Sequence, residues 1–508
     1  MEDGKATLRS KIRVHDKHRL EIKLDFDLDD VDKTSYSVET YFFIPRSLNI
    51  GPHNYHKEQF YDSCQRYIRF STPKISLSRM CDYGLEYSPL TRIRMKMKEI
   101  QAGDNSTGLI EKICYEIKLL GCAVRGELRD NVKQFIEDYR SSGISTVLEN
   151  TINAFLTDFS NFLKEFDSLR TEMSVPIVPV KVKETFAFCD EYVSLSIEEH
   201  LGNLAYRMQN IPEFKTRESV KSFHNTITKL VNEEEQYRRE RSYPSVFDKK
   251  SSNELLIYRR GMLKKFVSAV LFIRAEFSEW EALTQIIFGF AAGVAMLFAT
   301  VISVYYQNRY TTTSVPFVTA LVISYIFKDR IKDWIKFSFS KKLAHWISDR
   351  RIDVIDPDTF KSIGELKEGF TFIKHENLPP DVGRLRNADF FTSVDPEGRP
   401  ERIFKYKKNI KLKPRAIMRN HARRKGINDI MRFNMARLIQ QADDPVADYK
   451  YYDPSSGMME NAGCARVYHI NVIVRYTYVD RDGEEKEYFE RHRLVVNKNG
   501  IIRKEEVR

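Results

Sequence analysis

The stretch IIFGFAAGVAMLFATVISVYY, residues 286–306, has the largest influence on how this sequence is interpreted. It lies within a window from Ala282 to Asn308 that contains no charged residue. About 20 apolar residues, at about 1.5 Å per residue, match the roughly 30 Å hydrocarbon core of a bilayer. The stretch therefore predicts a helix that spans a membrane.

A second apolar stretch, VPFVTALVISYIF, follows at residues 315–327 after a short polar connection. Its length is near the lower limit for a span, so it is typical either of a second spanning helix or of a shorter re-entrant or interfacial helix. Because so few residues separate the two stretches, we expect a two-helix transmembrane hairpin over residues 281–327.

The positive charges that flank the hairpin predict its orientation. Lysine and arginine are frequent on both sides of it, whereas the connection carries only Arg309. Such residues favour the cytoplasmic side of a membrane. We therefore expect an integral protein of a plasma or inner membrane, with both the N-terminus and the C-terminus in the cytoplasm.

Small residues recur within both apolar stretches. Gly289 and Gly293 are four apart in the first, and Ala320 and Ser324 are four apart in the second. Small residues let helix backbones approach closely in lipid. This spacing is explained equally well by packing of the two helices on each other and by the formation of a homo-oligomer.

Residues 328–350 keep a helical period of apolar residues among basic ones. This pattern indicates a basic juxtamembrane helix, which either lies at the membrane interface or forms a simple stalk. At the interface, its cations would contact anionic lipid headgroups. These cations are Lys328, Arg330, Lys332, Lys336, Lys341 and Lys342.

The rest of the chain predicts three cytosolic regions. Residues 1–105 are β-rich, and residues 106–280 form a helical bundle with an apolar stripe at heptad spacing. The stripe consists of Ile152, Phe155, Phe159, Phe162, Phe166, Leu169 and Met173. Residues 351–508 form an α+β domain that ends in a three-stranded antiparallel meander, which we expect a helix at about 415–440 to cover. The predicted fold class is therefore an α+β membrane protein with a two-helix transmembrane hairpin.

A basic run lies between Arg402 and Lys425, where the chain has no acidic residue; the net charge of the whole chain is +11. The run is consistent with a solvated strand face and helix start, or with a contact to anionic lipid headgroups. A nucleic-acid contact is disfavoured, because the predicted tether brings lipid nearer. A headgroup contact would use Lys405, Lys407, Lys408, Lys411, Lys413, Arg415, Arg419, Arg423, Arg424 and Lys425.

Motifs that carry chemistry are absent from the sequence. It contains no phosphate-binding, dinucleotide-binding, serine-hydrolase, zinc-protease or EF-hand signature. The six cysteines form no C-x-x-C pair, and the two histidine pairs lack a second half at metal-ligand spacing. We predict no cofactor and no metal, identify no catalytic residue, and consider an enzyme the less expected case.

Three functions are compatible with this pattern. The first is a non-enzymatic, membrane-anchored sensor or scaffold that faces the cytosol, self-associates and binds a protein partner of unknown kind. The second is a membrane-perturbing effector, of stress, defence or toxin type, that acts through oligomerised hairpins. The third is a membrane-bound enzyme whose site the sequence does not reveal.

Overall fold

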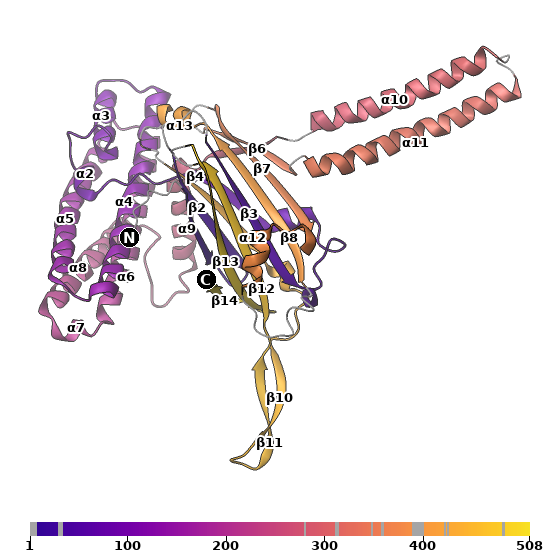
Figure 1. The fold of residues 1–508 in the computed structure, drawn as a ribbon. Helices are drawn as coiled ribbons and strands as arrows, with labels where there is room; N and C mark the ends of the chain where they lie inside the picture. Colours follow the sequence, from indigo (N-terminus) through magenta and orange to yellow (C-terminus); the bar gives the residue numbers. More distant parts are fainter. Residues whose placement is uncertain are drawn as a thin grey trace. The chain divides into compact units, whose positions relative to one another are not determined.

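The computed structural model describes residues 8–28, 34–278, 281–309, 314–346, 349–356, 360–388, 401–420, 423, 426–479 and 483–507. They form two compact units. The β unit comprises residues 1–68, 273–422 and 426–508, and the helical unit comprises residues 69–272 and 423–425. The helical unit is thus an insertion between two parts of the β unit (Figure 1).

The β unit contains two large sheets, and the larger one is antiparallel throughout. The first has the order β1 (Leu8–Val14), β2 (Arg19–Asp27), β9 (Gly426–Asn434) and β4 (Cys64–Phe70). The second has the order β14 (Gly500–Glu506), β13 (Glu485–Asn497), β12 (Tyr468–Val479), β3 (Thr34–Pro45), β8 (Glu401–Leu412), β7 (Ser362–Ile373), β6 (Arg350–Ile355) and β5 (Arg274–Ser278). The predicted C-terminal meander is present as β12, β13 and β14.

Alternate residues along each strand point to the same side, so each sheet has one apolar face. The two sheets pack together through these faces. Phe42 of β3, Phe404 of β8 and Phe433 of β9 lie between them, together with Phe60 of the short helix α1 (Lys57–Ser63). The ring centroids of Phe42 and Phe404 are 4.7 Å apart, and those of Phe60 and Phe433 are 5.3 Å apart. The helix α12 (Pro380–Asn387) packs on the other face of the larger sheet, through Val382.

The strand β9 replaces the helix that we expected at about 415–440. Only Pro414–Asn420 (α13) and Ala436–Ile439 (α14) are helical there. Residues 427, 429, 431 and 433 alternate into the sandwich, and β9 pairs with β2, for example Met431 with Ile22. The strand belongs to a sheet whose other members lie about 400 residues away along the chain, so local pattern did not identify it.

The helical unit is built mainly from long helices around a large apolar core, and it has a second, smaller apolar cluster that includes Leu119, Leu195 and Leu263. Its helices are α2 (Leu77–Met80), α3 (Pro89–Gln101), α4 (Thr107–Ser142), α5 (Thr146–Ser174), α6 (Val180–Gln209), α7 (Glu213–Thr216), α8 (Glu218–Glu240) and α9 (Glu254–Ser268). The Ser145 hydroxyl caps α5 by accepting from the backbone N–H of Leu148 at 3.2 Å. The whole predicted stripe of α5, from Ile152 to Met173, is buried in this core.

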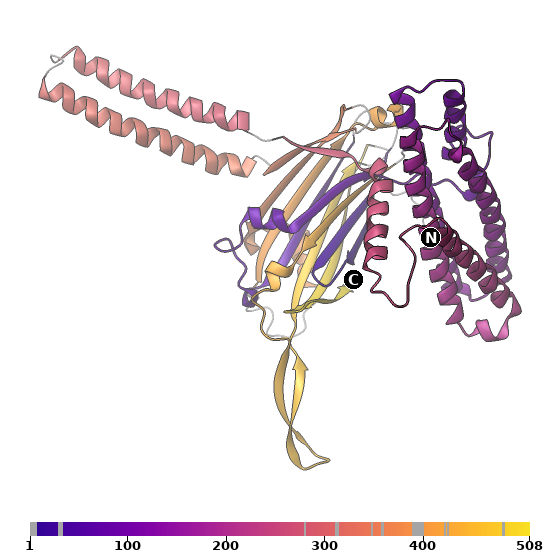
Figure 2. The ribbon, with the colours of Figure 1, turned by 180° about the vertical axis from the view of Figure 1, so that it is seen from behind.

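The prediction of a two-helix transmembrane hairpin was wrong. The helices α10 (Glu281–Gln307) and α11 (Val315–Trp346) do lie side by side and antiparallel (Figures 1 and 2). Within the described part of the chain, however, only Phe288–Gln307 is long and apolar enough to cross a membrane. In α11 the apolar stretch 315–327 continues without a break into charged residues, so no sufficiently apolar window forms.

This finding also corrects the predicted class. The chain has an α+β fold with three sheets among its described residues, and its classification as a transmembrane or integral membrane protein of a cell membrane is unsupported. The expected juxtamembrane helix is not a separate element either, since residues 328–346 are the second half of α11.

Candidate functional site

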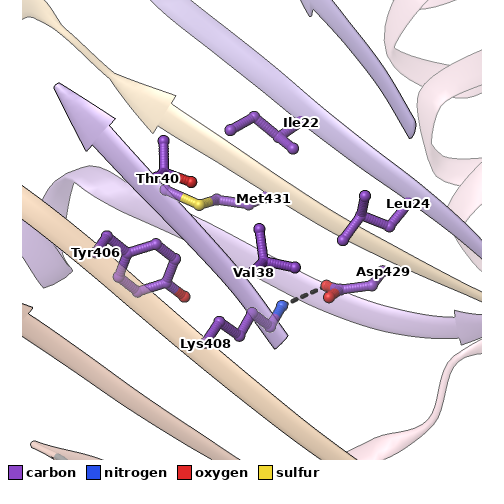
Figure 3. Close-up of a pocket in the computed structure, with 8 residues that line it drawn as sticks. All are labelled: Ile22, Leu24, Val38, Thr40, Tyr406, Lys408, Asp429 and Met431. Carbon is purple, nitrogen blue, oxygen red and sulfur yellow. Dashed lines mark hydrogen bonds and ion pairs between the residues drawn. The ribbon is translucent and has the colours of Figure 1, made fainter. Parts of the chain in front are cut away.

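A charged pair lies buried between the two sheets of the β unit. Alternation along β8 turns Tyr406 and Lys408 inward, toward Asp429 of β9 (Figure 3). The Lys408 ammonium forms an ion pair with the Asp429 carboxylate, and the Tyr36 hydroxyl donates to the same carboxylate at 3.2 Å. The side chains of Lys408 and Asp429 are 3% and 2% exposed. Burial lowers the pKa of Lys408, while the adjacent negative charge of Asp429 opposes that shift.

A second buried pair lies on the same side of the larger sheet. Arg66 of β4 forms an ion pair with Glu368 of β7, whose carboxylate also accepts from the Tyr406 hydroxyl. Burial raises the pKa of Tyr406 well above its usual value, so this hydroxyl remains a donor. The two pairs balance in charge, which is the condition under which buried ions are tolerated.

The cavity at the Lys408 pair is too small for a substrate. It offers about 10 Å³ to the centre of a water molecule, which is near the least space that holds one water. Its lining consists of Ile22, Leu24, Val38, Thr40, Tyr406, Lys408, Asp429 and Met431 (Figure 3). The arrangement fixes how β8 faces β9 rather than binding a ligand.

The exposed apolar surface of α10 and α11 is the candidate functional site. In α10 the exposed large side chains are Phe288, Phe290, Val294, Met296, Leu297, Val301, Val304 and Tyr305. In α11 they are Val315, Val318, Leu321, Val322, Ile323, Tyr325, Ile326, Phe327, Trp334 and Phe337. The exposed fractions of these side chains run from 36% to 78%. A contiguous apolar surface of this kind marks a site of interaction.

The small residues of this hairpin have two different environments. Ala291 and Ala295 are fully buried where α10 meets α11, and the Ser324 hydroxyl donates to the carbonyl of Ala299 at 3.5 Å. Ala320 is half-buried on α11. By contrast, a Cβ added at Gly289 or Gly293 would meet nothing within 4 Å. Packing of the two helices therefore explains Ser324 but leaves both glycines on the outside.

Cations lie along the second half of α11. The ammonium of Lys328 lies 3.7 Å from the ring centroid of Tyr325, and that of Lys336 lies 4.6 Å from the ring centroid of Phe288. Lys332 contacts Asp329 at 3.7 Å, and Arg330 is exposed. The side chains of Lys341 and Lys342 lie outside the described residues.

The structure divides the basic run 402–425 among different environments. Lys405 and Lys407 point to the outer face of the larger sheet, and each ammonium is 3.1 Å from the carboxylate of Glu39. Burial alone would raise the pKa of Glu39, but the hydrogen bond from Tyr41 and these two cations outweigh burial and lower the pKa to about 2. Lys408 is instead buried, as described above.

The remaining members of the run do not form one patch with these lysines. Lys411, Lys413, Arg415 and Arg419 are exposed. Arg423 belongs to the helical unit, where its guanidinium donates two hydrogen bonds to Glu116, at 2.6 and 2.9 Å. Arg424 and Lys425 lie outside the described residues. Successive side chains of a strand point to opposite faces of its sheet, so Lys408 lies on the opposite face from Lys405 and Lys407. This alternation can be read from the sequence.

Comparison with known proteins adds no assignment. No protein-family model matches the chain, and no curated protein matches it in sequence. Among the described residues, no group of three or more histidine, cysteine, aspartate or glutamate side chains could hold a metal ion.

Proposed function

We propose that this protein is a non-enzymatic scaffold that attaches to a lipid bilayer by burying the apolar surface of α10. The observation that carries the proposal is the exposure of large apolar side chains along α10 from Phe288 to Tyr305, outside the line of Ala291 and Ala295 that faces α11. A protein groove accommodates a helix with one apolar face. Acyl chains accept a helix that is apolar around its circumference.

The energetics favour attachment. Removing one leucine, valine or phenylalanine side chain from water contributes about 1.5 to 3 kcal/mol. Three such side chains, for example Phe290, Leu297 and Val301, would together contribute about 4.5 to 9 kcal/mol. The exposed Arg330 and the other cations of α11 would then add attraction to anionic headgroups, at about 1 kcal/mol each. The β unit and the helical unit supply the surfaces on which a protein partner binds.

Flotation of the full chain with vesicles tests the proposal. We expect the wild-type chain to float with neutral phosphatidylcholine vesicles and more completely when phosphatidylserine is present. The double variant Leu297→Asp, Val301→Asp should stay at the bottom of the gradient, because burying two carboxylates in acyl chains is unfavourable.

The matched control is Ile502→Asp, which adds a charge at a half-exposed apolar residue of β14. This variant should float as the wild type does. The proposal fails if the wild-type chain does not float with either kind of vesicle, or if the double variant floats as completely as the wild type.

A further inference from the structure

The strands β10 (Val446–Asp453) and β11 (Met458–Ala465) form a sheet of their own, which projects from the larger sheets (Figures 1 and 2). Nearly every residue in them is exposed, including Tyr449 at 62% and Tyr452 at 60%. A two-stranded hairpin without further packing is marginally stable in water. Binding of a partner to this hairpin would therefore stabilise it.

One edge of β10 is open. Among the described strands, β10 pairs only with β11, so every second residue directs its backbone N–H and C=O groups away from the hairpin. Such an edge is a template for another strand. Two charged residues on it, Asp448 and Lys450, form no ion pair with any side chain that the structure describes.

The sequence of β10 is complementary to itself. We propose that β10 pairs antiparallel with β10 of a second copy of this chain, about a two-fold axis at Tyr449. In this register Asp448 lies opposite the partner's Lys450, and Lys450 lies opposite the partner's Asp448. Val446 likewise lies opposite the partner's Tyr452. Opposite charges and aromatic–aliphatic pairs facing each other across strands are the pairs that stabilise sheets.

The charges also select this register. A two-fold axis in an antiparallel pair must pass between two copies of the same residue. Moving the axis by one residue would place Asp448 opposite the partner's Asp448, or Lys450 opposite the partner's Lys450. Like charges that face each other directly are destabilising. Only the register with the axis at Tyr449 places both Asp448 and Lys450 opposite residues of opposite charge. The interface joins two copies and leaves no further copy to be added.

Reversal of the charges tests the pairing. We expect sedimentation equilibrium of the full chain to show a dimer. Asp448→Lys alone, or Lys450→Asp alone, places like charges opposite each other twice, so each should raise the Kd of the dimer about tenfold. The double variant Asp448→Lys, Lys450→Asp restores the pairing and should restore the wild-type Kd. A monomeric wild type, unaffected single variants, or a double variant as weak as the single ones would overturn the proposal.

Association through the outside of α10 needs a separate control. The variant Gly289→Ile, Gly293→Ile fills the open glycine positions of α10 and leaves β10 unchanged. We expect its dimer to have the wild-type Kd. Loss of the dimer in this variant would overturn the assignment to β10.

A disulfide measures the register directly. Facing residues in an antiparallel pair have Cα atoms about 4.5 to 5.5 Å apart, which suits a disulfide. Tyr449→Cys, in a chain that also carries Cys464→Ser, should therefore cross-link into a dimer on oxidation. In the matched control Tyr451→Cys, the two introduced thiols lie about 13 Å apart along the strands and should not cross-link. Equal cross-linking of both variants, or none with Tyr449→Cys, would contradict the register.

Discussion

The helices α5 and α10 are both rich in large apolar side chains, yet these side chains have opposite environments. In α5 the rings of Phe159, Phe162 and Phe166 are completely buried in the helical unit. In α10 Phe290 is 60% exposed and Leu297 is 69% exposed. The apolar residues of α5 form a stripe, whereas those of α10 surround the helix. A striped helix completes its packing within the chain, and a helix that is apolar all round needs surroundings that the chain does not supply.

The largest expected difference follows from removing one ring from each helix. Phe162→Ala opens a cavity in the core of the helical unit and should lower the free energy of unfolding by about 3 to 5 kcal/mol. Phe290→Ala should change it by less than about 0.5 kcal/mol, because this ring packs on little. Urea unfolding followed by circular dichroism at 222 nm compares the two variants. Equal losses of stability would contradict the distinction between α5 and α10.

The second difference is between a buried arginine of the helical unit and an exposed arginine of α11. Arg238 of α8 is 1% exposed, and its guanidinium donates to the Ser194 hydroxyl at 2.7 Å and pairs with Glu198. Arg238→Met leaves the buried Ser194 hydroxyl and the partly exposed Glu198 carboxylate without this partner, and should cost about 2 to 3 kcal/mol. Arg330→Gln on α11 should leave the urea midpoint unchanged. A similar shift of the midpoint in both variants would show that Arg330 has buried partners too.

The third difference concerns pH. Burial, and then the charge of Arg125, lower the pKa of His200 in α6 to about 4. The unfolded chain takes up this proton near pH 6.5, so the helical unit should lose stability as the pH falls from about 6.5 toward 4. We expect a loss of about 1 to 2 kcal/mol between pH 7.5 and 5, which His200→Gln should largely remove.

The apolar helix should lack this response. The window from Ala282 to Asn308 contains no histidine, carboxylate or lysine. Flotation with neutral vesicles should therefore be the same at pH 7.5 and pH 5. A marked change over this range would indicate that titrating groups outside α10 control the attachment.

The smallest expected effect is that of one α11 cation on binding to anionic vesicles. Arg330→Gln removes one cation and should weaken binding to phosphatidylserine-containing vesicles by about 1 kcal/mol, roughly fivefold. Its binding to neutral vesicles should be unaltered. Titration of a fixed protein concentration with each type of vesicle provides the measurement. An equal loss with both types would mean that Arg330 acts through packing.

Periodic local patterns were the part of the fold that the sequence made predictable. The stripe along α5 and the meander β12 to β14 are both present, because each depends on neighbours close in the chain. The second span was mispredicted because a short apolar stretch was judged without the charged turns that continue α11. Strand β9 was expected to be helical because its pairing partner, β2, lies at the other end of the sequence.

The candidate site was only partly accessible from sequence. The apolar character of residues 286–306 was evident, but the side of α10 that faces α11 was not, since it depends on Ala291 and Ala295 rather than on Gly289 and Gly293. The ion pair of Lys408 was missed because the basic run was counted as a charge total. Its position in a two-residue alternation, next to buried Tyr406, carried the relevant information.

The inserted position of the helical unit has a consequence for how the chain is made. Ile22 pairs with Met431, so β2 must wait for β9 while the ribosome adds the residues between them, on the order of 20 to 80 s. During this time the helical unit can fold by itself. The backbone N–H of Ile273 donates to the carbonyl of Ile68 at 3.1 Å, so its two ends meet. A folded insertion thus replaces a long flexible loop by a short one, and the early strands are already next to the place where the late ones arrive.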